Sequence, residues 1–286
     1  MQQKYVPGVL VRRWPETGDV PVVFDIPRSG TTYPCEFRPS APFLALHQSV
    51  SMHVEKLYEG VVDAGAHWLY ALFPNTFIDA NRHEADIDPE LLDGPWPHPL
   101  QTTQKSRLGI GLIHSKCGPD AIPIYAEKLS VAEVRRRIDR YYRPYHDTLA
   151  GILADCRTRF GKAYHISCHS MASIGGASTL DRGQPRSDFD IGDRNGQTCD
   201  PALTELVVTR LRAHGYNVTI NHHYPGAESI RKHAAPDRGV HSLQIEITRA
   251  LYMNERTFEL NDAFQQIQSQ LTDLARCLAD FARAGG

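Results

Sequence analysis

Short apolar runs alternate with amphipathic stretches along almost the whole chain, and this alternation constrains the fold more than any other feature. The runs are rich in β-branched residues, as buried strands are, and the stretches between them place apolar residues at helical spacing. Such alternation predicts an α/β protein whose central sheet carries helices on both faces. No internal repeat or long linker divides residues 1–286, so a single domain is expected. The expected strands are 20–26, 67–73, 77–80, 108–113, 163–169, 189–193, 216–220 and 242–248.

Helix signals fill the intervals between these strands. A stripe over 43–61 has helical spacing, and Ser130 with Glu133 has the spacing of a capping box at the start of a long helix. Pro144 is expected to kink or break that helix. Further helices are expected from Asp200 to Gly215 and over 258–283, whereas the Pro- and Asp-rich segment 86–104 predicts a surface loop.

Composition excludes several classes of protein. A net charge of −2 gives no basic footprint for nucleic acid, and no apolar run has the length of a signal peptide core or a membrane span. The six cysteines form no C-x-x-C pair, so free thiols are expected rather than disulfides or a structural zinc knuckle. We therefore expect a cytoplasmic enzyme with a small-molecule substrate and no nucleic-acid or membrane partner. The oligomeric state does not follow from the sequence.

Polar residues at strand ends are the candidates for the functional site. In open α/β sheets a ligand lies beyond the carboxyl ends of the strands. Five such ends attract attention, and they read DIPRSG, DANRHE, CHSM, GDRNG and IEITR.

His169 and Glu246 are the two candidates inside strands. His169 stands where a β-branched strand gives way to small polar residues, a position suited to a metal ligand or a base. Its alternative is a histidine that only caps the strand. Glu246 lies between two isoleucines, where burial would raise its pKa toward that of a general base. Its alternatives are an ion pair with Arg249 and an outward-facing edge position.

Asn81, Arg82 and Tyr224 are candidates for binding a substrate. Arg82 offers a planar fork for a carboxylate, and Asn81 adds a side-chain hydrogen bond. The alternative is a structural Arg–Asp pair in a loop. Tyr224 follows two histidines in the segment HHYPGA, which can line a small-molecule pocket or form a surface turn.

Over roughly residues 20 to 255 the chain resembles the N-formylglutamate amidohydrolases. The motifs occur in the order seen in that family and read VVFDIPRSGTTYP, FIDANRHEADIDP, RPYH, CHSM, GDRNGQTC, HGYNVTINHHYPGA and HSLQIEITRALYM. The resemblance implies the fold group of zinc carboxypeptidases and aminoacylase-like deacylases, with a mixed sheet between helices. It also implies zinc-dependent release of formate from N-formyl-L-glutamate at the end of a histidine-degradation route.

The resemblance implies a role for each candidate. His169 is similar to the metal ligand on the middle strand, and Glu246 to the carboxylate that activates water. Asn81 and Arg82 resemble the pair that holds a substrate carboxylate. Arg249 is expected to bind the second carboxylate of a glutamate-like substrate.

Two positions depart from the family pattern. The family usually reads PHSG where this chain has Arg28, and an arginine has no lone pair to offer zinc. Ser167 stands where an acid usually precedes the CHSM histidine. His53 and Glu55 lie near the expected acidic ligand position and are the further candidate metal ligands. On a helix they would be about 200° apart, so they can share a site only if the backbone departs from helix there; the alternative is that they are helix-surface residues. For Arg28 we expect either a substrate carboxylate or an ion pair with Asp25.

These observations leave three hypotheses for function. The first is a zinc-dependent amidohydrolase of a small N-acyl amino acid, above all N-formyl-L-glutamate. The second is a deacylase or carboxypeptidase-like hydrolase that acts on another acyl group. The third is a non-catalytic binder of glutamate derivatives that lost its metal with the change to Arg28.

Overall fold

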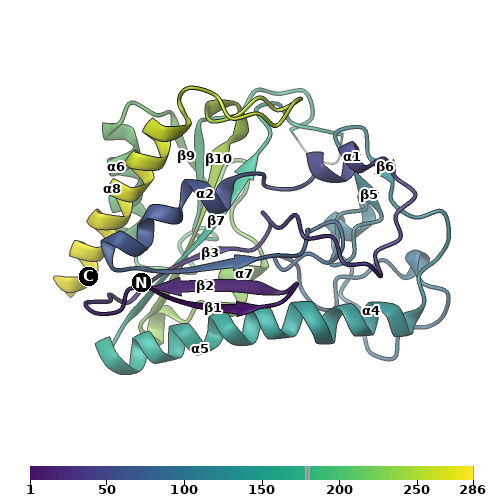
Figure 1. Cartoon of the computed structure of the whole chain (residues 1–286), viewed down its shortest axis with the longest axis horizontal. Coiled ribbons are helices and arrows are strands. Elements are labelled where there is room, and N and C mark those ends of the chain that lie inside the picture. Colours follow the sequence, from purple (N-terminus) through teal and green to yellow (C-terminus); the bar gives the residue numbers. More distant parts are fainter. Residues whose placement is uncertain (178, 180, 286) are drawn as a thin grey trace.

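A mixed eight-stranded sheet forms the centre of the computed structural model, which describes residues 1–177, 179 and 181–285. The strand order is β1-β2-β4-β3-β7-β10-β8-β9, and Figure 1 shows the sheet between its helices. The bounds are β1 Gln2–Val6, β2 Leu10–Trp14, β3 Val22–Ile26, β4 His67–Ala71, β7 Ala163–Met171, β8 Phe189–Gly192, β9 Val218–Ile220 and β10 Val240–Thr248. A separate small ribbon pairs β5 Lys116–Cys117 with β6 Ile122–Pro123.

Strand direction differs between the middle and the margins of the sheet. The four strands β4, β3, β7 and β10 run parallel, so their carboxyl ends meet at one edge. β2 pairs antiparallel with β4, and β8 pairs antiparallel with β10. The expected α/β class with a mixed central sheet is confirmed.

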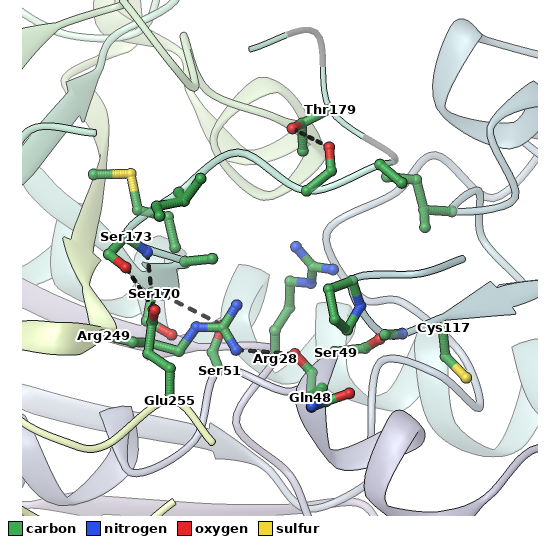
Figure 2. Close-up of a pocket in the computed structure, with 18 of the residues that line it drawn as sticks. Arg28, Gln48, Ser49, Ser51, Cys117, Ser170, Ser173, Thr179, Arg249 and Glu255 are labelled. Carbon is green, nitrogen blue, oxygen red and sulfur yellow. Dashed lines mark hydrogen bonds between the residues drawn. The ribbon is translucent and has the colours of Figure 1, made fainter. Parts of the chain in front are cut away.

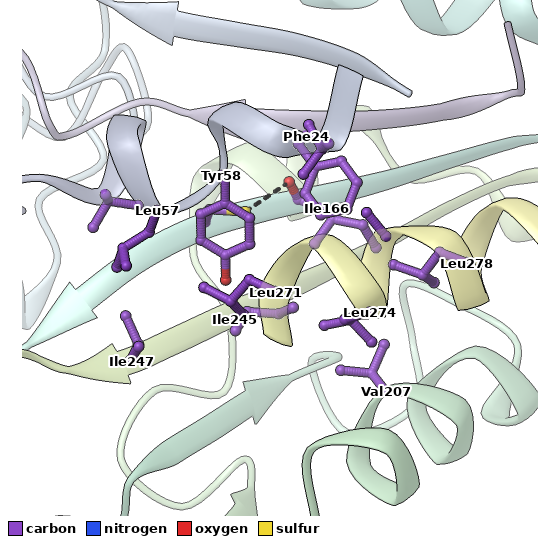
Figure 3. Packing of buried hydrophobic residues seen from close by; sticks show 14 of the residues in the cluster. Phe24, Leu57, Tyr58, Ile166, Val207, Ile245, Ile247, Leu271, Leu274 and Leu278 are labelled. Carbon is purple, nitrogen blue, oxygen red and sulfur yellow. Dashed lines mark hydrogen bonds between the residues drawn. The ribbon is translucent and has the colours of Figure 1, made fainter. Parts of the chain in front are cut away.

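Helices cover both faces of the sheet. On one face α8 (Phe264–Arg283) packs with α6 (Pro201–Ala213), α2 (Val54–Leu57) and η1 (Glu59–Ala64) over the apolar side chains of the central strands. Figure 3 shows Leu271 and Leu274 of α8 beside Ile245 of β10. Each such fully buried side chain contributes about 1.5–3 kcal/mol. The other face carries the long α5 (Arg143–Phe160) and the short α7 (Glu228–His233).

The remaining elements lie around the site edge of the sheet or in connections. They are α1 Phe43–Gln48, η2 Pro89–Leu91, α3 Gln104–Arg107, α4 Val131–Arg137, η3 Ile138–Tyr142, η4 Pro236–Arg238 and η5 Arg249–Leu251. Among the described residues, no helix has the length and apolar character needed to cross a membrane. The expectation of free thiols is confirmed for all six cysteines.

Several strand predictions were wrong. Segment 77–80 forms a turn, because the N–H groups of Phe77 and Ile78 donate to the carbonyl of Pro74 rather than to a neighbouring strand. Segment 108–113 is also irregular, with only a single bridge from Ile110 to His114. Sequence analysis missed β1 and β2, which form a hairpin at the sheet margin and are only partly buried.

Helix boundaries also differ from expectation. The stripe over 43–61 is broken between α1 and α2, where His53 has φ 65° and begins α2. Ser130 caps α4 as expected by accepting from Glu133 N–H. The helix continues past Pro144 without a break, because a π-helical turn at η3 comes directly before that proline. The closing helix α8 begins at Phe264 instead of 258.

Candidate active site

Polar side chains occupy one face of the central strands, and the apolar core occupies the other. In the pairing of β7 with β10, His169 lies opposite Glu246, and Ser167 lies opposite Gln244. Paired residues point to the same side of a sheet, so Asp25 of β3 and Asp190 of β8 extend these two rows. The alternation of strand residues therefore concentrates polar groups on one side without interrupting the core on the other.

Glu246 is a buried carboxylate without an ion-pair partner among the described residues. It is 4% exposed, and its Oε1 accepts a hydrogen bond from Gln244 Nε2 at 2.9 Å. Burial raises its pKa to about 7, although nearby Arg28 opposes that effect. The alternative ion pair with Arg249 is not formed, because Arg249 Nη1 donates to the carbonyl of Gln48. A carboxylate with this pKa suits a general base near neutral pH.

His169 is a buried, neutral imidazole with one free ring nitrogen. Its Nε2 lies 2.9 Å from Ser167 Oγ and 3.2 Å from Asn81 Nδ2. Its Nδ1 is buried and has no hydrogen-bond partner within the described part of the chain. Burial, followed by the charge of Arg28, lowers the His169 pKa to about 3. Nδ1 is therefore the ring atom that no described residue engages.

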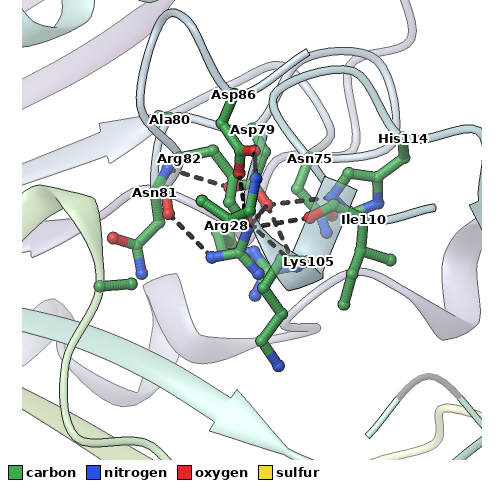
Figure 4. A network of polar contacts seen from close by, with 12 residues as sticks. Arg28, Asn75, Asp79, Ala80, Asn81, Arg82, Asp86, Lys105, Ile110 and His114 are labelled. Atoms are coloured by element: carbon green, nitrogen blue, oxygen red, sulfur yellow. Dashed lines mark hydrogen bonds and ion pairs between the residues drawn. The ribbon is translucent and has the colours of Figure 1, made fainter. Parts of the chain in front are cut away.

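Arg28 forms an ion pair with Asp79, which corrects the expected pairing with Asp25. Arg28 Nη2 lies 3.3 Å from Asp79 Oδ2, and His114 Nε2 lies 3.0 Å from the same oxygen (Figure 4). Burial alone would raise the Asp79 pKa, but Arg28, Arg82 and His114 together lower it, so the carboxylate stays ionised.

Asp25 instead belongs to a buried cluster beneath the sheet edge. Its carboxylate accepts from the hydroxyls of Tyr145, Ser167 and Ser229 and lies 3.3 Å from His165 Nε2. His165 thus belongs to this cluster.

Arg82 is held by backbone carbonyls and keeps one nitrogen for a ligand. Its Nε donates to Ile110 O at 2.8 Å and its Nη1 to Asn81 O at 2.9 Å, which leaves Nη2. The alternative of a tight pair with Asp79 is weak, since the closest separation is 4.0 Å. The Asn81 side chain is occupied inside the protein, where Oδ1 accepts from Ser229 N at 2.8 Å. Its role toward a substrate stays a prediction.

A cavity of about 350 Å³ opens at this edge of the sheet (Figure 2). Arg28 lines it and also lies close enough to Glu246 and His169 to shift their pKa values. Those two groups are buried and do not themselves line the cavity. Among the described residues, seven basic side chains and one carboxylate, Glu255, line it, so the cavity suits an anionic ligand. The basic residues are Arg28, Arg82, Lys105, Lys116, Arg186, Arg249 and Arg256.

Lys105 and Arg186 are functional candidates that sequence analysis missed. Arg186 donates through Nε and Nη2 to the carboxylate of Asp181, at 2.7 and 2.8 Å, which fixes its plane. Its guanidinium lies 5.2 Å from the ring centre of Tyr224, and Lys105 Nζ lies 5.8 Å from the same ring. Burial, then the charges of Arg82 and Arg28, lower the Lys105 pKa to about 8. Neither residue follows a strand end, so no local pattern marked them.

Tyr224 lines the cavity as expected, and Asp190 positions it. The Asp190 carboxylate accepts the backbone N–H groups of His222, His223 and Tyr224, the last at 2.7 Å. At Gly192 a Cβ atom would lie 2.6 Å from the Tyr224 carbonyl oxygen, so only glycine permits this close approach.

The strand end GDRNG does not contribute to the cavity. Because β8 runs antiparallel to β10, its carboxyl end points to the opposite edge of the sheet. Asp193 there accepts from Gly196 N and Asn221 Nδ2 and stabilises a turn. This part of the strand-end expectation was wrong.

The residues expected to hold zinc do not converge. His53 Nε2 lies 2.9 Å from the carbonyl oxygen of Phe258, and Glu55 accepts a hydrogen bond from the Ser29 hydroxyl. Across residues 1–177, 179 and 181–285, no three His, Cys, Asp or Glu side chains group as a metal site. With Arg28 beside His169, the donor set does not fit a zinc ion with three protein ligands.

Comparisons with known proteins find relatives that match most of the chain. A family model described as N-formylglutamate amidohydrolase matches residues 20–253. A crystal structure of N-formylglutamate amidohydrolase from Ralstonia eutropha JMP134 is 42% identical, with a TM-score of 0.91 over 98% of this chain and 100% of that one. A protein named N-formylglutamate deformylase from Pseudomonas aeruginosa is 28% identical over 84% of both chains. One of the same name from Pseudomonas putida is 29% identical over 71% of this chain and 70% of its own.

Proposed function

The chain belongs to the N-formylglutamate amidohydrolase family, and we propose that its cavity hydrolyses N-formyl-L-glutamate to formate and glutamate. One observation carries this proposal: a buried carboxylate, Glu246, with a pKa near 7 lies close to Arg28 in the wall of a cationic cavity. A general base and cations for two carboxylates are what hydrolysis of a dianionic amide requires.

The cations of the cavity bind the substrate. Arg82 Nη2 is placed for the α-carboxylate, because its other donors are already engaged by carbonyl oxygens. Arg249 and Arg186 are positioned for the side-chain carboxylate, and Lys105 adds charge between Arg82 and Tyr224. Binding at two points orients the formyl group, so geometry selects among N-acyl amino acids.

Glu246 moves the protons of the reaction. Its ionised form takes a proton from the attacking water and then passes it to the leaving nitrogen. The resemblance also implies zinc, which would polarise the formyl oxygen and lower the pKa of water. The described donor set does not fit a metal ion, so the roles below are those of the chain's own residues.

We further infer that the reaction takes place in the cytoplasm and serves histidine degradation. Both inferences rest on the resemblance to the family.

Substrate specificity provides the test. Purified protein is incubated with N-formyl-L-glutamate, N-formyl-L-leucine and N-acetyl-L-glutamate, and release of formate or acetate is followed by proton NMR. We expect turnover of the first substrate and far slower turnover of the other two. Faster cleavage of N-acetyl-L-glutamate would favour a deacylase. Calorimetric binding of N-formyl-L-glutamate without any formate would favour a non-catalytic binder.

A further inference from the structure

Arg28 lines the cavity, and its charge acts on both buried groups of the site, His169 and Glu246. It follows β3 directly, where Ser51 N–H donates to its carbonyl and Asp79 pairs with its guanidinium. Its charge is the second contribution to the pKa shifts of both His169 and Glu246, after burial. Its side chain is 20% exposed, so it can contact a molecule in the cavity.

The Arg28 guanidinium retains unused donors. Its Nε is buried and has no hydrogen-bond partner in the described part of the chain. A guanidinium presents five N–H donors and does not lose its charge at physiological pH. Nη2 is the nitrogen paired with Asp79, so Nη1, on a side chain that is 20% exposed, is the group left to donate to an oxygen of a bound substrate.

The same placement disfavours a divalent cation. Arg28 adds like-charge repulsion beside His169 and offers no electron pair. The two other candidate ligands are engaged in hydrogen bonds within the protein: Glu55 accepts from the Ser29 hydroxyl, and His53 donates to the Phe258 carbonyl. One strand end therefore carries a fixed positive charge where three metal ligands would have to converge.

We propose that Arg28 does the work of a metal ion in this chain: its guanidinium binds the formyl oxygen, and hydrolysis proceeds without bound zinc. This inference rests on the proposed function. It makes Arg28 a catalytic residue, since it contacts a reacting atom of the substrate.

Glu246 and Arg28 can supply the proton transfers and the charge stabilisation that hydrolysis requires. Water attacks the formyl carbon while its proton passes to the Glu246 carboxylate, and the π electrons of the C=O bond move to the oxygen. That oxyanion is stabilised by the N–H donors of Arg28. When the intermediate collapses, the C=O bond re-forms and the C–N bond breaks. The nitrogen keeps the electron pair and receives the proton from Glu246, which yields glutamate and formic acid. The formic acid then loses its hydroxyl proton to solvent and leaves as formate.

Metal analysis of the parent chain is the first test. The protein is produced in zinc-supplemented medium, its metal content is measured by mass spectrometry, and formate release is assayed with and without dipicolinate. We expect zinc far below one ion per chain and unchanged turnover with the chelator. Stoichiometric zinc, with activity lost to dipicolinate and restored by zinc, overturns the role of Arg28 but keeps the amidohydrolase. Failure to release formate under any condition overturns the proposed function instead.

Substitution of Arg28 is the second test. Arg28→Lys keeps the charge but loses the fork, and we expect kcat to fall by about 10²–10³-fold, as for loss of an oxyanion donor, with a smaller change in KM. Arg276→Lys on the exposed surface of α8 is the matched control and should keep the parental kcat. An Arg28→Lys variant with parental kcat overturns the proposal. The metal measurement needs no variant, so it decides even if Arg28→Lys fails to fold.

Discussion

Glu246 of β10 lies directly opposite His169 of β7 in the parallel pairing of the two strands. The two side chains therefore share one face at the carboxyl edge of the sheet, although they come from segments far apart in the chain. Burial raises the pKa of the Glu246 carboxyl and lowers the pKa of the His169 imidazole. Both groups thereby favour their neutral forms, and Glu246 is the one that titrates near pH 7.

The Glu246→Gln variant should bind substrate but turn it over poorly. The amide keeps the shape and the contact with Gln244, yet it cannot accept a proton from water. We expect kcat to fall by about 10²–10⁴-fold, the usual contribution of a general base. Steady-state assays of formate release, with calorimetry for binding, make the measurement. Turnover near the parental rate would dismiss Glu246 as the base.

The pH dependence of kcat/KM should be bell-shaped, with its maximum between about pH 7 and 8. The rising limb follows ionisation of Glu246, whose pKa is about 7, because only the carboxylate accepts a proton. The falling limb follows loss of charge at Lys105, whose pKa is about 8. In Lys105→Arg the falling limb should move well above pH 8. A profile that is flat from pH 5 to 9 contradicts both assignments.

The stability of the parent chain should fall relative to Glu246→Gln as the pH rises. The folded-state pKa of Glu246 is about 7, above the ordinary value of 4.5, so folding favours the protonated form. The protonated acid makes its full contribution to the free energy of unfolding below pH 4.5, and this contribution is lost as the pH rises through 7. A shift of this size corresponds to about 3 kcal/mol at most. Urea unfolding of the parent chain and of Glu246→Gln at pH 5 and pH 8 measures this contribution. If the difference in unfolding free energy between the two chains is the same at both pH values, the prediction is wrong.

The Arg82→Lys variant should lose both affinity for substrate and stability. A lysine cannot reproduce the two bonds from Nε and Nη1 to the Ile110 and Asn81 carbonyls, and the loss of satisfied buried groups costs about 1–3 kcal/mol. It also loses the fork for a carboxylate, so KM should rise. Thermal unfolding and KM are measured together, with Arg276→Lys as the control. A lowered melting temperature with an unchanged KM would make Arg82 purely structural.

The Arg28→His variant should gain affinity for zinc. The substitution removes a fixed positive charge beside His169 and adds an imidazole nitrogen at the same strand end. Chelator competition on the parent, on Arg28→His and on Arg28→His with His169→Ala measures the change. Zinc binding equal in all three chains would show that neither position takes part in a metal site.

The fold was largely predictable because the core strands carry their own signal. β3, β7 and β10 each place a row of apolar side chains on the same face of the sheet, so their positions follow from local sequence. β1 and β2 escaped notice because marginal strands are only partly buried and show weak alternation. Segments 77–80 and 108–113 are apolar yet irregular, because they pack into the core as turns.

The site was predictable only where a residue belongs to a strand or to its end. Glu246 and His169 stand out because a polar residue inside an apolar strand is unusual. The partner of Arg28 could not be predicted, since Asp79 and Asp25 lie equally well at strand ends and only the tertiary turn at 74–79 selects Asp79. Arg186 comes from a loop and Lys105 from the short helix α3, and no spacing in the sequence relates them to Tyr224.

The basic lining of the cavity has a consequence for the encounter with substrate. The chain as a whole carries a charge of −2, but its positive groups gather at one mouth, so the molecule has a strongly directional field. A small dianion that diffuses nearby is drawn to that mouth by its positive groups. Capture then depends on the reach of the field, which shrinks to about 8 Å at physiological ionic strength. The same lining thus sets how often substrate arrives as well as how it is held.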